Sequence, residues 1–279
     1  MKKGYIKIHL PKNDIIVRTL DVMMELGQIS AVEESNNTLI VLDTWQNRNN
    51  LRKIIRDAFP EKEWTETYLK EQDWNQKWID GFQPIPIHDT LWITPPWHAH
   101  KIAKNHEKII INPGNAFGTG THESTRLALE LMSCLIRPGD KILDLGCGSG
   151  ILSIAARKMG ASVVHAIDND PEIAHNLSEN IKNNHITKIT WEIIDILQMN
   201  NFGCDLAVIN IQKHVILPLL ARFNVAKEIP NRVILAGLLK EHRGDIEFAL
   251  EKQAYTVIDT SQMNEWIAIA AIKRSINET

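Results

Sequence analysis

The first part of the chain mixes two hydrophobic periodicities. Apolar and polar side chains alternate over residues 5–10, as in a half-buried strand, whereas apolar residues recur at helical spacing over residues 17–26. Asn36 and Asn37 indicate a turn, and Pro60 closes the last helical pattern. The elements expected in chain order are a strand at 5–10, a helix at 17–26, strands at 30–34 and 38–42, and a helix at 49–58. We therefore expect a small N-terminal α+β domain over residues 1–66.

A polar stretch over residues 67–82 follows, in which Trp74 and Trp78 are spaced to share one face of a helix. We interpret it as a helical linker whose two indoles pack at the domain boundary. Over residues 83–279 strands and helices alternate, which predicts a parallel sheet with helices on both faces. The strands expected there are 141–145, 162–167, 189–194, 205–210 and 231–237, followed by a closing pair at 254–259 and 266–272.

Composition narrows the function classes. The 31 basic residues nearly balance the 34 acidic residues, so no strong positive field draws the chain to nucleic acid or to an anionic membrane. Three isolated cysteines fit neither a disulfide framework nor a zinc site. The chain shows no signal sequence, and no apolar run approaches the roughly 18 residues of a membrane span. We expect a monomeric cytoplasmic protein without a metal site and without direct contact to nucleic acid or membrane.

A glycine-rich loop follows the strand expected at 141–145. Gly146, Gly148 and Gly150 let the backbone approach a ligand closely, at the crevice where the carboxyl ends of the strands open. A dinucleotide fingerprint has its third glycine one residue later, where this chain has Ile151. The spacing therefore disfavours an NAD oxidoreductase and favours S-adenosylmethionine (SAM), which has no pyrophosphate to hold.

Two carboxylates follow the next two strands. Asp168 lies 22 residues after Gly146 at a strand end, where its carboxylate can accept both ribose hydroxyls of the cofactor. Asp195 either accepts a hydrogen bond from the adenine amino group or is a solvated turn residue. The loop and the first carboxylate together predict a SAM-dependent methyltransferase of the α/β class, with a Rossmann-like catalytic domain and the small N-terminal domain.

The segment over residues 112–125, Asn-Pro-Gly-Asn-Ala-Phe-Gly-Thr-Gly-Thr-His-Glu-Ser-Thr, closely resembles the A-F-G-T-G-T-H-x-T-T loop of the PrmA family of ribosomal protein L11 methyltransferases. The resemblance covers nearly the whole chain, including the tryptophan-bearing linker, residues 91–97 and the sequence Val208-Ile-Asn-Ile. It implies SAM-dependent methylation of amino groups of L11, which the N-terminal domain would recognise. It also implies that the SAM site is lined by Thr125, Gly146, Asp168 and Asn210, beneath a loop formed by Phe117 to His122.

The residues of this loop suit such a role. Gly118 and Gly120 give the loop conformational freedom, and Thr121 is expected to cap a helix that begins near Glu123. We interpret His122 as a loop or packing histidine and not as a base, because the sequence offers no partner to fix its tautomer.

Asn210 ends the strand expected at 205–210. Its amide carbonyl can orient an incoming amine, and the alternative is an ordinary N-cap of the following helix. An acceptor lysine must lose its proton, since its ordinary pKa is about 10.4. Trp97, Phe117 and Ile211 are the candidates for an apolar lining that desolvates the amine and favours its neutral form.

The chain departs from the family pattern directly after Asn210. The family usually continues N-I-L-A, whereas this chain has Gln212 and Lys213 at the last two of these positions. An inward Lys213 would repel a protonated acceptor, and an outward one changes nothing. The departure keeps open a different protein or a small amine as acceptor. A SAM-binding module without turnover is the remaining alternative.

Overall fold

The computed structural model describes residues 4–25, 28–29, 31–35, 38–70, 82–88, 91–114 and 116–274. The chain divides into two compact units, residues 1–82 and 83–279, each with its own hydrophobic core. The helix expected in the linker, with Trp74 and Trp78 on one face, falls on residues 71–81 and lies outside the described residues.

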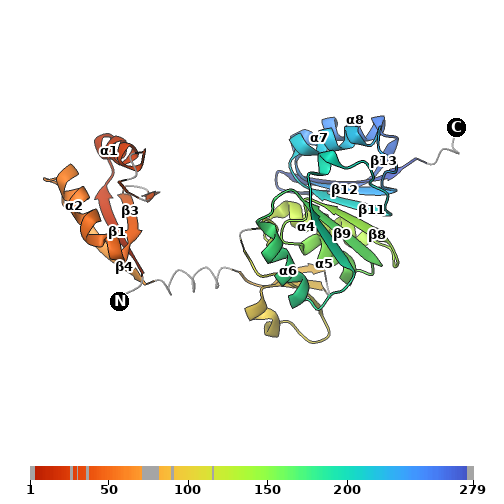
Figure 1. Ribbon diagram of the computed structural model, residues 1–279, viewed down its shortest axis with the longest axis horizontal. Helices are drawn as coiled ribbons and strands as arrows, with labels where there is room; N and C mark the ends of the chain where they lie inside the picture. Colours follow the sequence, from red (N-terminus) through yellow and green to blue (C-terminus); the bar gives the residue numbers. More distant parts are fainter. Residues whose placement is uncertain are drawn as a thin grey trace. The chain divides into compact units, whose positions relative to one another are not determined.

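The N-terminal unit is a four-stranded antiparallel sheet with two helices (Figure 1). Its strand order β2-β3-β1-β4 is that of the ferredoxin-like fold. Alternate strand residues such as Ile6, Ile8 and Val41 are fully buried in one core with Leu20 and Ile55 of the helices, which explains the alternating sequence. The elements in chain order are β1 (Gly4–Pro11), α1 (Asp14–Glu25), β2 (Ala31–Ser35), β3 (Thr38–Thr44), α2 (Arg48–Ala58) and β4 (Thr65–Lys70).

Strand β4 is an element that the hydrophobic pattern did not predict. It pairs with β1, so residues 67–70 belong to the sheet, although we expected them in the linker. Thr65, Glu66 and Thr67 are exposed, because β4 is an edge strand. An edge strand is held by its backbone ladder and needs few apolar side chains, so it leaves little signal in the sequence.

The second unit is built on a seven-stranded sheet in the order β10-β9-β8-β11-β12-β14-β13 (Figure 1). The strands β8 to β12 run parallel, and β14 runs antiparallel to both of its neighbours. Each strand expected from the sequence is present, and the α/β prediction is confirmed. The strands are β8 (Lys141–Leu145), β9 (Val163–Asp168), β10 (Ile189–Ile193), β11 (Leu206–Asn210), β12 (Arg232–Leu239), β13 (Tyr255–Met263) and β14 (Trp266–Lys273).

Helices cover both faces of this sheet. Successive strand residues face opposite sides: Ile142 joins the core beneath α4 and α5, and Leu143 joins the core beneath α7 and α8. Burial on both faces explains why the parallel strands read as continuous apolar runs. The helices are α4 (Glu123–Leu135), α5 (Ile151–Lys158), α6 (Ile173–Asn183), α7 (Lys213–Arg222) and α8 (Arg243–Lys252).

A small sheet of β5 (Ile85–His88), β6 (Leu91–Thr94) and β7 (Glu107–Ile110) belongs to the same unit. Ile93 and Ile109 bury its apolar side in the core beneath α4 and α5. The chain leaves β7 toward the carboxyl ends of the large sheet, and the small sheet thereby anchors the loop that precedes α4. Within the described part of the chain, no helix is long and apolar enough to cross a membrane.

Candidate functional site

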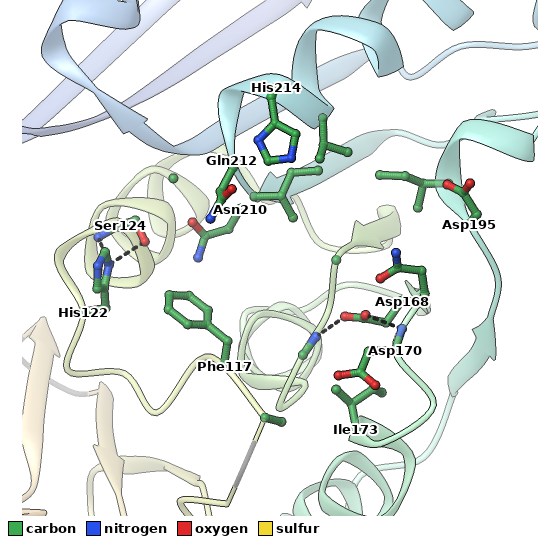
Figure 2. A pocket seen from close by; sticks show the side chains of 18 of the residues that line it. Phe117, His122, Ser124, Asp168, Asp170, Ile173, Asp195, Asn210, Gln212 and His214 are labelled. Atoms are coloured by element: carbon green, nitrogen blue, oxygen red, sulfur yellow. Dashed lines mark hydrogen bonds between the residues drawn. The ribbon is translucent and has the colours of Figure 1, made fainter. Parts of the chain in front are cut away.

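A cavity of about 700 Å3 lies at the carboxyl ends of β8, β9 and β11 (Figure 2). Its lining comes from the glycine loop after β8, the turns after β9 and β10, the end of β11, the start of α7, Gly237 of β12, the loop before α4, and Trp266 at the start of β14. Adjacent parallel strands end at the same edge of the sheet, so residues far apart in sequence converge there. This is the crevice that the sequence predicted.

The glycine loop has the conformation that its residues suggest. The φ angles of Gly146, Gly148 and Gly150 are +79°, +50° and +80°, a region that residues with a side chain rarely adopt. A Cβ atom on Gly146 would overlap the Ile211 side chain, and one on Gly148 would overlap the carbonyl oxygen of Phe117. The loop is therefore confined to glycine, and it exposes its backbone to the cavity.

Asp168 is fixed beside this loop. Its Oδ2 accepts the Gly148 N–H at 2.8 Å, and its Oδ1 accepts the Asp170 N–H at 3.0 Å. Each carboxylate oxygen accepts one backbone donor and keeps further lone-pair capacity. An anchored carboxylate at the cavity wall fits a ligand with two neighbouring hydroxyl groups, as a ribose has, and the residues present thus fit SAM.

Asp144 lies buried beneath the glycine loop. Burial, with a further contribution from the nearby Asp168 carboxylate, raises the pKa of Asp144 from 3.8 to about 7. Ser153 donates a hydrogen bond to Oδ2 at 2.6 Å, and Oδ1 has no partner among the described residues. The folded protein therefore disfavours the ionised form of this carboxyl group.

Replacing Asp144 with asparagine is expected to change how stability depends on pH. Because the folded-state pKa is raised, Asp144 lowers the free energy of unfolding of the wild type as pH rises from about 4 to about 7. Asp144→Asn keeps an acceptor for Ser153 and removes the titrating carboxyl group. Relative to the wild type, its free energy of unfolding should therefore rise by about 1 kcal/mol or more between about pH 4 and about pH 7. Thermal unfolding at several pH values measures the difference. An exposed control, Glu130→Gln on α4, should show no such trend, and a difference independent of pH would refute the assignment.

The loop before α4 is fastened to the glycine loop. The Ser149 N–H donates to the Phe117 carbonyl at 2.9 Å, and the Ser149 hydroxyl donates to the Gly118 carbonyl at 2.6 Å. The Phe117 side chain remains 58% exposed at the cavity. The His122 ring lies edge-on to both Phe117 and Trp266, with centroid distances of 5.4 Å and 4.5 Å. An aromatic wall thus borders one side of the cavity.

Helix α4 begins at Glu123 as expected, but its cap differs from our prediction. His122 is the N-cap, and its Nδ1 accepts the Ser124 N–H at 3.2 Å. The Thr121 hydroxyl instead bonds to that of Thr119, because Thr121 lies one residue before the N-cap position. The expected Thr121 cap is therefore wrong. An accepting Nδ1 places the proton of the neutral His122 ring on Nε2.

Asn210 lines the cavity, and its side chain is held by a buried residue of α4. Its Nδ2 donates to the Thr125 hydroxyl at 3.3 Å, and its buried Oδ1 has no partner among the described residues. Thr125 is fully buried and does not line the cavity, whereas its neighbour Ser124 does. The N-cap of α7 is Gln212, so the alternative of Asn210 as a helix cap is wrong.

The other expected residues divide between cavity and surroundings. Asp195 caps a short 3-10 turn by accepting the Leu197 N–H at 2.9 Å, and it also lines the cavity. Trp97 is not among the lining residues, and Trp266 lines the cavity instead. Lys213 pairs with Asp245 of α8 at 2.5 Å and does not line this cavity, in agreement with the outward interpretation.

Three asparagines, two on α6 and one at its C-cap, support the loop before α4 and its surroundings. The Asn180 Oδ1 accepts the Asn112 N–H at 2.8 Å, and its Nδ2 donates to the Ser149 carbonyl at 2.9 Å. Asn176 Nδ2 donates to the Asn112 carbonyl at 3.0 Å, and Asn184 Oδ1 accepts the Ile110 N–H at 2.8 Å. Asn180 therefore joins the start of the loop to the glycine loop. The spacing of these asparagines along the chain gives no sign of what they contact, so the sequence did not predict their role.

Asn180→Ala is expected to cost about 2 kcal/mol of stability, because it leaves the Asn112 N–H and the Ser149 carbonyl unpaired in the interior. It should also weaken SAM binding several-fold, since the glycine loop loses a tether. Asn184→Ala is the matched control: it removes the two bonds to Ile110 and the bond from Nδ2 to the Asn180 carbonyl, none of which reaches the glycine loop, so it should lower stability without changing SAM affinity. Denaturant unfolding and calorimetric titration with SAM measure the two effects. Equal SAM affinities of the two variants would contradict the tether.

The reversed strand β14, which lies between β12 and β13, distinguishes the topology of this sheet from that of an all-parallel dinucleotide-binding sheet. Together with the anchored Asp168 beside the glycine loop, it defines the unit as a SAM-dependent methyltransferase, and SAM is the cofactor. The family model described as "Ribosomal protein L11 methyltransferase (PrmA)" matches residues 15–274, so the chain belongs to this family. The resemblance stated from the sequence is confirmed.

Individual relatives agree with this assignment. The ribosomal protein L11 methyltransferase of Desulforapulum autotrophicum is 37% identical over 207 residues, which cover 73% of this chain and 68% of that protein. The protein of the same name from Bacillus subtilis is 29% identical over 274 residues, covering 96% and 80%. A crystal structure of ribosomal protein L11 methylase from Lactobacillus delbrueckii subsp. bulgaricus matches with a TM-score of 0.63 and 29% identity, covering 69% of this chain and all of that one.

Proposed function

We propose that this protein methylates amino groups of ribosomal protein L11, either lysine side chains or the N-terminal amine or both. The observation that carries the proposal is the buried, unpartnered Oδ1 of Asn210 at the wall of the cavity. A buried carbonyl without a donor is costly, and an incoming N–H satisfies it. Family membership supports L11 as the protein that brings this amine.

We assign the cofactor contacts to the glycine-loop side of the cavity. Asp168 would accept the ribose hydroxyls, Asp195 the adenine amino group, and Gly146 and Gly148 would approach the cofactor through their backbone. Phe117 would cover it from the loop. Asn210 borders both the cofactor and the acceptor, with Thr125 acting through it. When bound, SAM supplies a methyl group on a positively charged sulfur, which is already activated for transfer.

On the acceptor side, the protein mainly positions the amine. Asn210 Oδ1 accepts one N–H of the acceptor, which directs the nitrogen lone pair toward the methyl group. Phe117, Ile211 and Trp266 provide an apolar surround that favours the neutral amine over the ammonium. Trp266 takes the place in which we expected Trp97.

The N-terminal unit is the proposed recognition domain for L11. Its ferredoxin-like sheet lies outside the cavity-bearing unit, so it is available to bind a part of the substrate that is not methylated. In this proposal the enzyme works as a monomer in the cytoplasm on the L11 protein, without contacting nucleic acid. The near balance of 31 basic and 34 acidic residues supports a protein substrate.

Intact-mass analysis of purified unmethylated L11, incubated with the protein and SAM, tests the proposal. Increments of one methyl group are expected, and none in the Asp168→Ala control. No increment, with SAM binding established by calorimetry, would refute L11 as acceptor and favour another protein or small amine. Gln212 would then be the next residue to change, because it lines the cavity where the family usually has leucine. SAM binding without transfer to any acceptor would indicate a binding module.

A further inference from the structure

The two sides of the cavity differ in charge (Figure 2). Asp168, Asp170 and Asp195 lie on the side of the glycine loop and of the turn after β10. The side around Asn210 has no carboxylate among its described lining residues, and instead has the imidazoles of His122 and His214. An amine that arrives there as an ammonium ion meets no countercharge, so it has to give up its proton to a neutral base or to water.

His214 also borders a second, smaller cavity of about 540 Å3. The two cavities share Gln212, His214, Gly237 and Trp266. His214 is the second residue of α7 and is drawn beside Gln212 and Asn210 in Figure 2. His214 is exposed, so a proton that it takes up on the side of the larger cavity can pass directly to water.

The hydrogen bonds of the neighbouring histidines leave His214 as the available base. His122 Nδ1 accepts the Ser124 N–H at 3.2 Å, and His242 Nδ1 accepts the Leu239 N–H at 3.2 Å. Each of these neutral rings therefore carries its proton on Nε2 and offers a donor. The His214 ring is exposed, and it makes no hydrogen bond or ion pair with any residue of the described part of the chain. One of its ring nitrogens is free to accept.

We propose that His214 accepts the proton which the acceptor ammonium must lose before it attacks, a role that rests on the proposed function. The proton passes from the substrate nitrogen to a ring nitrogen of His214 and leaves the nitrogen lone pair free. That lone pair forms the new bond to the methyl carbon while the carbon–sulfur bond breaks, and its electron pair stays on sulfur. The imidazolium then returns its proton to the surrounding water, which makes His214 ready for the next methylation.

Several charged and titratable groups lie near His214. Lys213 precedes it on α7, and Asp245 of α8 neutralises that charge at 2.5 Å. His242 faces it across the smaller cavity and His122 across the larger one. The three carboxylates Asp168, Asp170 and Asp195 lie on the opposite side of the larger cavity.

The pH dependence of methyl transfer to L11 tests this role. His214→Gln keeps a polar side chain but cannot take up a proton, so kcat/KM should fall about tenfold near pH 7. The loss should disappear toward about pH 10, where free lysine is itself largely deprotonated. SAM affinity, measured by calorimetry, should be unchanged. His214→Ala should give the same profile, and His175→Gln, on the exposed face of α6, should retain the wild-type profile.

A second measurement does not depend on turnover. NMR signals of the His214 ring are recorded at about pH 8 in the presence of S-adenosylhomocysteine, where an ordinary histidine is neutral. Addition of L11 should shift the signals, because the acceptor ammonium then donates a hydrogen bond to the free ring nitrogen, and L11 with acetylated amines, which lacks the ammonium donor, should leave them nearly unmoved.

The outcomes separate the two proposals. Parallel pH profiles of the wild type and both His214 variants, or an unmoved ring signal, would overturn the role of His214 while methylation of L11 stands. Absence of methyl transfer by the wild type would overturn the proposed function, and the role of His214 with it.

Discussion

Asp168→Ala should weaken SAM binding by about a hundredfold or more and abolish methyl transfer. The carboxylate has two tasks: it would bind both ribose hydroxyls, and it holds the Gly148 N–H and the Asp170 N–H in place. Hydrogen bonds to a charged group are each worth about 1.5 to 3 kcal/mol, so losing two of them to the ligand already gives this factor. Calorimetric titration with SAM measures it.

Glu172→Gln provides the control, because Glu172 is an exposed acidic residue nearby at the start of α6 that does not line the cavity. Its SAM affinity should match the wild type. The SAM affinity of Asp168→Asn should lie between those of Asp168→Ala and Glu172→Gln, since an amide keeps one acceptor but loses the charge. Wild-type affinity in Asp168→Ala would rule out the ribose contact.

Asn210→Ala should lower kcat for L11 by about a hundredfold and weaken SAM binding by a much smaller factor, because Asn210 borders the cofactor as well as the acceptor. An orienting hydrogen bond to the reacting nitrogen acts mainly on the transfer step, and misplacement of the attacking atom costs about this much. Asn210 makes no hydrogen bond to the glycine loop, so the cofactor side should stay intact. Single-turnover rates at saturating SAM measure the loss.

Thr125→Val is the companion variant. It keeps the shape of the buried side chain and removes the hydroxyl that accepts a hydrogen bond from Asn210 Nδ2 at 3.3 Å. The amide is then free to rotate, so kcat should fall by a smaller factor, about tenfold. A loss in Thr125→Val as large as that in Asn210→Ala would indicate that Thr125 itself contacts the reacting groups.

The catalytic unit was largely predictable because its signals are local and strong. Continuous apolar runs mark strands buried on both faces, and Gly146 to Gly150 followed by Asp168 mark one edge of the sheet. These features depend on the residues themselves and on their order along the chain. The convergence of Asp168, Asp195 and Asn210 then follows from parallel topology alone.

The rest depended on contacts that the sequence does not encode locally. Trp266 enters the cavity because β14 is reversed beside β12, and nothing near Trp266 in the sequence signals that pairing. Thr125 was assigned to the cavity wall by resemblance, but the helical turn at the start of α4 directs Ser124 there instead. Histidine is an unusual N-cap, so the hydroxyl of Thr121 was the more natural expectation.

Ser149 joins the loop before α4 to the glycine loop through two hydrogen bonds, one from its N–H and one from its hydroxyl. Held at Phe117 and Gly118, this loop borders the cavity as a wall. Closing the active site to water is then the task of the acceptor, which has to fill the opening with its own surface. We expect a protein surface to fill this opening more completely than a free amino acid, which favours a protein acceptor over a small amine.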